Sequence, residues 1–74
     1  NALESLPAGA IVFREGDAGD QMFVLQSGRV RLTKQGRKGV RVLATLGPGE
    51  FFGEMAILNN RPRTATAEVV EAAK

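Results

Sequence analysis

Hydrophobic and polar residues alternate with a period of two along most of the chain, and no long helical period interrupts this pattern. Alternation of this kind is typical of β-strands with one buried face. A continuous apolar run instead predicts a strand that is buried on both faces. The pattern predicts a short strand at Ile11–Arg14, alternating strands at Arg29–Thr33 and Thr64–Val70, and a fully buried strand at Met22–Gln26.

The alternation also predicts which side chains point inward. On the strand that begins at Arg29, Val30 and Leu32 are expected to face the core. The loop Gln35–Gly39, which contains two glycines, predicts a hairpin that turns the chain back. The return strand should present one inward face made of Val40, Val42, Ala44 and Leu46, and the last strand one made of Ala65, Ala67 and Val69.

Turn residues separate these strands. Glu15–Asp20 is rich in Gly and Asp, and Gly47–Glu50 combines Pro with two glycines. Only Glu54–Leu58 is compatible with a helix, and Asn59–Pro62 ends it after one or two turns. The predicted fold is therefore all-β: an antiparallel β-roll or jelly roll, that is, a double-stranded β-helix, with one short helix.

Length and composition narrow the function. The 74 residues suit a single domain spanning 1–74, and because the chain begins at Asn1 we expect it to be a fragment of a longer protein. The absence of Cys and His excludes disulfides, most zinc sites and catalysis by Cys or His. No apolar segment is long enough to cross a membrane, and no signal peptide opens the chain, so we expect a cytoplasmic location without membrane insertion.

Charge is unevenly distributed. Six cations and no acid lie between Gln21 and Gly49, on the predicted hairpin. A basic ribbon can attract nucleic acid, but it is more often simply a solvated face. No aromatic residue lies among these cations for a base to stack on, so nucleic-acid binding is the weaker interpretation.

The segment from Phe51 to Ala67 carries the chemistry. A glycine followed by one helical turn leaves backbone N–H groups unpaired, which favours an anion at Gly53, and the small Ala56 allows close approach. Arg63 offers a planar set of donors suited to a phosphate. Glu54 can accept a hydrogen bond from a sugar hydroxyl. Together these groups predict a sugar-phosphate site.

This segment resembles the phosphate-binding cassette of the cyclic nucleotide-binding domain family, which occurs in kinase regulatory subunits, nucleotide-gated channels and catabolite-type regulators. The resemblance rests on Phe52–Ala56 at one end and Pro62–Thr66 at the other. Upstream segments agree with it: Leu6–Gly9, Phe13–Asp20, Phe23–Leu25 and Ser27–Val30. It covers almost the whole chain.

The resemblance implies roles for individual residues. Gly53 and Ala56 would contribute backbone contacts, Glu54 would bind the ribose 2′-OH, and Arg63 would bind the cyclic phosphate. Thr64 and Ala65 would cap the phosphate. The implied ligand-binding set is Phe52, Gly53, Glu54, Met55, Ala56, Arg63, Thr64 and Ala65.

The resulting hypothesis is a non-catalytic sensor that binds cAMP or cGMP, uses no cofactor or metal, and controls an effector or lid helix outside these residues. The alternative is a degenerate domain that keeps the fold, has lost its ligand and serves dimer or partner contacts. Whether a homodimer forms is left open. The four phenylalanines (Phe13, Phe23, Phe51 and Phe52) are expected in the core, and Asp17 and Asp20 are expected to be turn residues.

Overall fold

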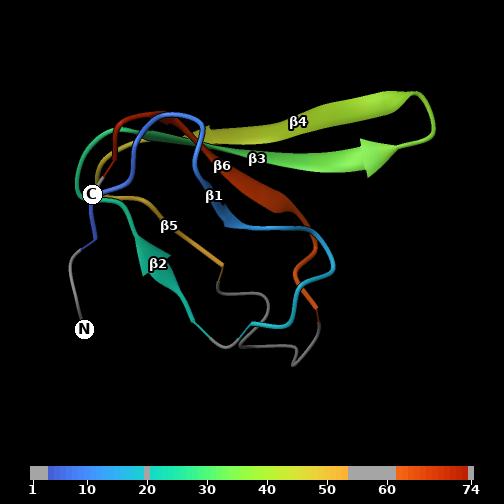
Figure 1. Cartoon of the computed structure of the whole chain (residues 1–74), viewed down its shortest axis with the longest axis horizontal. Helices are drawn as coiled ribbons and strands as arrows, with labels where there is room; N and C mark the ends of the chain where they lie inside the picture. The colour runs from blue at the N-terminus through green and yellow to red at the C-terminus, as the bar shows by residue number, and fades with distance from the viewer. Residues whose placement is uncertain (1–3, 20, 54–61, 74) are drawn as a thin grey trace.

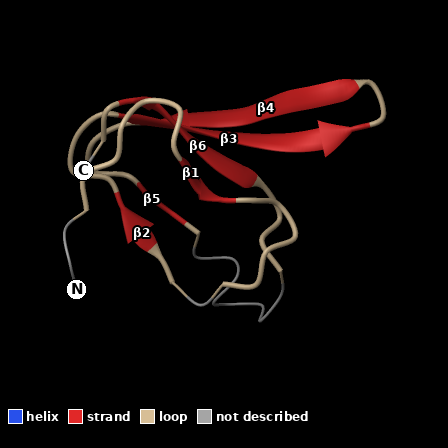
Figure 2. Cartoon of the chain, in the orientation of Figure 1, coloured by secondary structure: helices blue, strands red, loops and turns tan. Residues whose placement is uncertain are grey.

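The computed structural model describes residues 4–19, 21–53 and 62–73, and every regular element within them is a β-strand (Figure 2). The strands have the following bounds: β1 Ile11–Phe13, β2 Phe23–Val24, β3 Arg29–Gly36, β4 Gly39–Leu46, β5 Phe51–Phe52 and β6 Thr66–Glu71. None of the described residues belongs to a helix long and apolar enough to span a bilayer.

The strand pairing is nested. β3 pairs with β4, β2 with β5 and β1 with β6, all antiparallel, and an isolated bridge between Leu6 and Ala73 continues the series. The chain therefore forms one long ribbon that is folded back on itself. Because β6 also pairs with β3, the ribbon closes into a roll with a four-stranded sheet in the order β1-β6-β3-β4 and a two-stranded sheet of β2 and β5 (Figure 1). This arrangement confirms the predicted all-β antiparallel fold.

The core lies between the two sheets. Inward side chains of β3 and β6 meet those of β5 and of the residue that follows β2, because successive side chains of a strand point to opposite faces. The buried apolar residues of this cluster are Leu25, Val30, Phe52, Ala67, Val69 and Ala73. The predicted inward positions of β6 and Val30 are thus confirmed, and Leu32 packs against the same cluster.

The predicted inward face of the return strand is wrong at two positions. Leu32 pairs with Ala44, but the next β3 residue, Thr33, pairs with Val42, so Leu43 is an extra residue in β4. Such a β-bulge reverses the alternation beyond it. Val40 and Val42 are therefore 65% and 52% exposed, whereas Ala44 and Leu46 stay partly buried.

The hairpin is longer and its turn tighter than the sequence predicts. The β3–β4 ladder continues to the pair of Gly36 and Gly39, which leaves Arg37 and Lys38 as the turn. Gly39 has φ of 119°, a value that favours glycine. In Figure 1 this hairpin projects away from the rest of the roll, so none of the other described strands forms a second layer over its distal half.

The run at Met22–Gln26 is not buried on both faces, which corrects another prediction. Only Phe23 and Val24 form strand β2, and Val24 is 63% exposed. Val24 pairs with Phe51 of β5, which is also exposed. The prediction that Phe51 belongs to the core is therefore wrong. The two-stranded sheet meets the core through its other face alone. The helix predicted at Glu54–Leu58 lies outside the described residues.

Candidate functional site

Arg63 is the buried charged residue of the described chain. Its side chain is 6% exposed, and it precedes β6 at the end of the roll where β1, β2 and β5 meet. Burying a cation away from water is costly unless other groups compensate its charge. Groups around Arg63 must therefore compensate the cost of burying its charge.

Aromatic rings form the floor under the guanidinium. The Arg63 Cζ atom lies 4.3 Å from the centroid of the Phe13 ring and 5.6 Å from that of Phe23. Phe23 stacks on Phe52 with centroids 5.3 Å apart, and Phe13 lies 6.0 Å from Phe52. Rings at these distances attract a cation through their electron-rich faces. Phe13 and Phe23 are thus core residues, as predicted, that also support the arginine.

Two backbone carbonyl groups fix the orientation of the guanidinium. Its Nη1 donates to the carbonyl oxygen of Gly53 at 2.8 Å, and Nη2 donates to that of Gln21 at 2.9 Å. A guanidinium carries five N–H donors, so these two bonds leave others available. The buried Nε has no acceptor among the described residues. No carboxylate of the described residues pairs with Arg63.

Gly53 is required at its position by both backbone shape and space. Its φ is 85°, and a Cβ there would lie 2.8 Å from Arg63 Nη1 and 3.2 Å from Phe23 Cδ1. The sequence placed Gly53 and Arg63 in one site, and the structure brings them into contact across ten positions of the chain. Gly53 serves here as an acceptor for the arginine, a role the sequence did not indicate.

The backbone of Arg63 is held by the loop after β1. Its N–H donates to the carbonyl of Asp17 at 2.7 Å, and its own carbonyl accepts from the N–H of Gly16 at 2.8 Å. Asp17 also closes its turn, because its Oδ2 accepts from the N–H of Arg14. Asp17 is therefore a turn residue, as predicted, and this turn fixes the main chain from which the Arg63 side chain extends.

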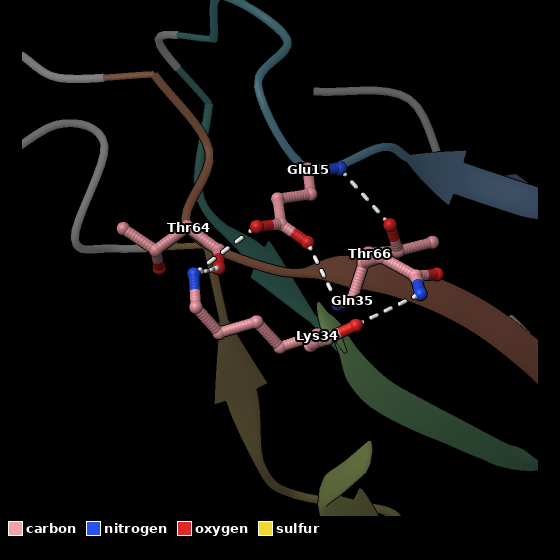
Figure 3. A network of polar contacts seen from close by, with 6 residues as sticks. Glu15, Lys34, Gln35, Thr64 and Thr66 are labelled. Atoms are coloured by element: carbon pink, nitrogen blue, oxygen red, sulfur yellow. Dashed lines mark hydrogen bonds and ion pairs between the residues drawn. The ribbon is translucent and has the colours of Figure 1, made fainter. Parts of the chain in front are cut away.

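A polar network continues from the same loop (Figure 3). The Glu15 carboxylate accepts from the N–H of Gln35 at 3.0 Å and from Lys34 Nζ at 3.1 Å. Lys34 Nζ also donates to the carbonyl of Thr64, and the N–H of Glu15 donates to Thr66 Oγ1. These bonds connect β3 to the segment that carries Arg63. The N–H of Gln35 and the ammonium of Lys34 hold the pKa of Glu15 below its ordinary value.

The predicted site residues divide into three groups. Gly53 and Arg63 are in contact, and Thr64 and Ala65 follow directly, Thr64 exposed and Ala65 buried. Phe52 is buried in the core, with its ring against Phe23. Glu54, Met55 and Ala56 lie outside the described residues. Asp20, predicted from the sequence to be a turn residue, lies outside them too.

Sequence reasoning missed the groups that hold the arginine. They are the rings of Phe13 and Phe23, the carbonyl of Gln21 and the backbone of Asp17. A backbone acceptor has no residue signature, which explains the last two. The recurrence of Phe at the inward positions of adjoining strands is a signal that could have suggested an aromatic floor.

The comparisons with known proteins agree with this geometry. A family model described as "Cyclic nucleotide-binding domain" matches residues 3–74. The chain belongs to the cyclic nucleotide-binding domain family. The recognition made from the cassette residues is thus confirmed, and with it the β-roll fold.

Two curated relatives illustrate the range of proteins that contain this domain. A cAMP-dependent protein kinase regulatory subunit of Yarrowia lipolytica is 48% identical over 78% of this chain and 15% of its own length. The Cyclic AMP receptor protein of Thermus thermophilus is 46% identical over 88% of this chain and 31% of its own length. The cyclic nucleotide-binding domain described here thus corresponds to less than a third of either relative.

A solved structure matches the fold closely. The regulatory domain of Toxoplasma gondii PKA with cAMP superposes with a TM-score of 0.91 and 38% identity, covering 95% of this chain and 27% of that one.

Proposed function

We propose that this cyclic nucleotide-binding domain binds cAMP or cGMP and that Arg63 binds the cyclic phosphate. The observation that carries the proposal is a buried guanidinium with no described carboxylate partner and a buried Nε that no described group accepts from. A phosphate monoanion supplies both the missing negative charge and the missing acceptors. The relatives named above, one of them solved with cAMP, support this ligand class.

We assign the remaining contacts to the nucleotide to other residues of the cassette. Glu54 accepts the ribose 2′-OH, the backbone at Gly53 and Ala56 lies against the sugar-phosphate, and Thr64 and Ala65 cap the phosphate. These assignments come from the positions of the residues in the cassette motif. Phe52 and Met55 complete the set.

The domain acts without chemistry of its own, as a cytoplasmic sensor. Binding changes the equilibrium between two states only as far as the ligand binds one state more tightly. The domain covers a small share of each relative, so we assign the regulated effector to another part of the whole protein. Contacts between two copies are a further way to transmit the change.

A calorimetric titration of the intact protein with cAMP and with cGMP tests the proposal. We expect saturable binding of at least one of them. A 2′-deoxy cyclic nucleotide should bind at least about tenfold more weakly, because a site built around a hydroxyl leaves its acceptor unpaired when the hydroxyl is missing. Equal affinity for the ribo and deoxy forms would remove Glu54 from the site.

One observation favours the second candidate, a domain that has lost its ligand. Both terminal nitrogens of Arg63 already donate to carbonyl groups, so part of the donor set is satisfied within the protein. The titration separates the two candidates, because a degenerate domain shows no heat of binding with either nucleotide at millimolar concentration.

A further inference from the structure

The cations of the β3–β4 hairpin divide into two groups by their partners. Those on β3 each form an ion pair: Arg29 with Glu71 at 3.1 Å, Arg31 with Glu68 at 3.4 Å, and Lys34 with Glu15 at 3.1 Å. The others, which we call the tip cations, are Arg37, Lys38 and Arg41. None of the tip cations is paired with a carboxylate of the described residues. Uncompensated charge is therefore concentrated at the tip of the hairpin, defined here as residues 35–43.

One of the tip cations faces another cation across the hairpin. Arg41 of β4 is directly opposite Lys34 of β3 in the antiparallel ladder. Like charges at directly opposite positions destabilise a sheet. The carboxylate of Glu15 compensates Lys34, but no described carboxylate compensates Arg41. The fold thus keeps a positive charge that an anionic group from another molecule can neutralise.

The tip also exposes apolar side chains. Val40 and Val42 are 65% and 52% exposed, and Leu43 is 48% exposed. Val40 is paired with Gln35 and Val42 with Thr33, so the two valines lie on the same face of the hairpin. An apolar patch with a polar rim is typical of an interaction site.

Strand β4 can accept a further strand at its free edge. It stands at one end of the sheet order β1-β6-β3-β4, so one of its edges pairs with no other described strand. Figure 1 shows the hairpin projecting from the roll, which leaves this edge accessible along the tip. The backbone groups of such an edge can bind an added extended segment through main-chain hydrogen bonds. Backbone donors and acceptors, apolar side chains and uncompensated cations therefore occur together on β4.

We propose that the hairpin tip is a docking surface for an acidic segment of a partner protein, bound in extended conformation along β4. Carboxylates of that segment pair with the tip cations, and its apolar residues cover Val40 and Val42. Charge selects this occupant over a second copy of the tip, because two copies would bring two sets of cations together. A nucleic acid fits less well, because residues 35–43 include no aromatic side chain on which a base could stack. The inference goes beyond the proposed function and does not depend on nucleotide binding.

Fluorescence anisotropy of labelled peptides with the intact protein tests the proposal. The probe is a peptide of about eight residues in which glutamate and valine alternate, and the control peptide has lysine in place of glutamate. We expect saturable binding of the glutamate peptide alone, and we expect added salt to weaken it because exposed charges are screened. Absence of saturable binding at millimolar peptide, or equal binding of the two peptides, would overturn the proposal.

Arg41→Gln and Arg29→Gln are matched variants, because each removes one exposed cation from the hairpin. Arg41→Gln should weaken binding of the glutamate peptide by about threefold, and Arg29→Gln, whose parent residue is paired with Glu71, by less than about 1.5-fold. Glutamine at all of the tip cations should weaken binding by about tenfold or more. Equal effects of the two single variants would show that net charge, and not the tip, attracts the peptide.

Val42→Ala tests the apolar part of the contact. It should weaken binding of the glutamate peptide by about twofold, because less apolar surface is buried. Unchanged affinity would contradict binding along β4. The urea midpoint of Arg41→Gln should not fall, because this substitution removes the repulsion from Lys34. A midpoint and an affinity that fall together would attribute the loss to the fold and refute the proposal.

Two further probes distinguish the partner classes. They are vesicles of phosphatidylserine and phosphatidylcholine, and an oligothymidylate of about the length of the peptide. At the same ionic strength both should bind more weakly than the glutamate peptide. If either binds as tightly or more tightly, and Arg41→Gln weakens that binding, the tip serves a membrane or a nucleic acid and the proposal is wrong.

Discussion

Two cationic regions of this domain have opposite surroundings. Arg63 is buried over Phe13 and fixed by two carbonyls, whereas Arg37, Lys38 and Arg41 lie exposed at the end of the β3–β4 hairpin. The hairpin carries more charge, and by composition it is the more conspicuous of the two. What separates them is the number of chain segments that converge on the cation.

Convergence of segments determines what a cation can recognise. A side chain on a projecting ribbon keeps its hydration and its rotamers, so it acts as a point charge that salt screens. Arg63 instead meets groups from β1, from the loop before β2 and from the residue after β5, and its donors have fixed directions. Fixed donors in a site removed from water can select an anion by shape.

The largest expected effect in this comparison is that of Arg63→Ala on ligand binding. Losing one partner of a desolvated charge pair costs on the order of 2–5 kcal/mol, so cyclic nucleotide affinity should fall by at least about tenfold. The fold should survive, because the inward residues of β3 and β6 are unchanged. Calorimetry measures the affinity, and circular dichroism checks the fold. Arg37→Ala on the hairpin is the control, and a similar loss there would show that net charge, and not Arg63, controls binding.

An intermediate effect is expected for a buried and an exposed valine of the β3–β4 hairpin. Val30 is 1% exposed and Val42 is 52% exposed. Val30→Ala removes two buried methyl groups and should lower the free energy of unfolding by about 2 kcal/mol, whereas Val42→Ala should change it by less than about 0.5 kcal/mol. Urea denaturation measures both. Equal costs would contradict the bulge at Leu43 as the feature that turns Val42 outward.

The smallest effect concerns the network that connects β3 to the Arg63 segment. Because the pKa of Glu15 is lowered by folding, its ionised form stabilises the native state above the unfolded pKa of about 4.5. That contribution is lost as the pH falls through the lower, native value. The difference in urea midpoint between the parent and Glu15→Gln should therefore shrink from pH 7 to pH 3. A difference that stays constant over this range would show that the Glu15 charge contributes nothing.

The outline of the fold was predictable because a strand with one buried face has an alternating sequence pattern that can be recognised locally. Alternation along β3 and β6 identified the inward residues Val30, Ala67 and Val69, and glycine-rich segments marked the turns. The pattern gave the wrong orientation for Val40 and Val42. The sequence continues to alternate there, but a single extra residue in β4 reverses which side chains face the core. A bulge is decided by how two strands pair, which no single strand encodes.

The same distinction applies to the site. The sequence by itself determined which residues could bind a phosphate, because an arginine near a turn glycine is a chemical pattern readable from the residue types. Only the tertiary structure decided how Arg63 is held. Three separate segments of the chain supply the groups around it: the rings of Phe13 and Phe23 and the carbonyls of Gln21 and Gly53. Burial and the direction of a donor exist only once those segments have packed together, and both are needed to turn a basic residue into a binding site.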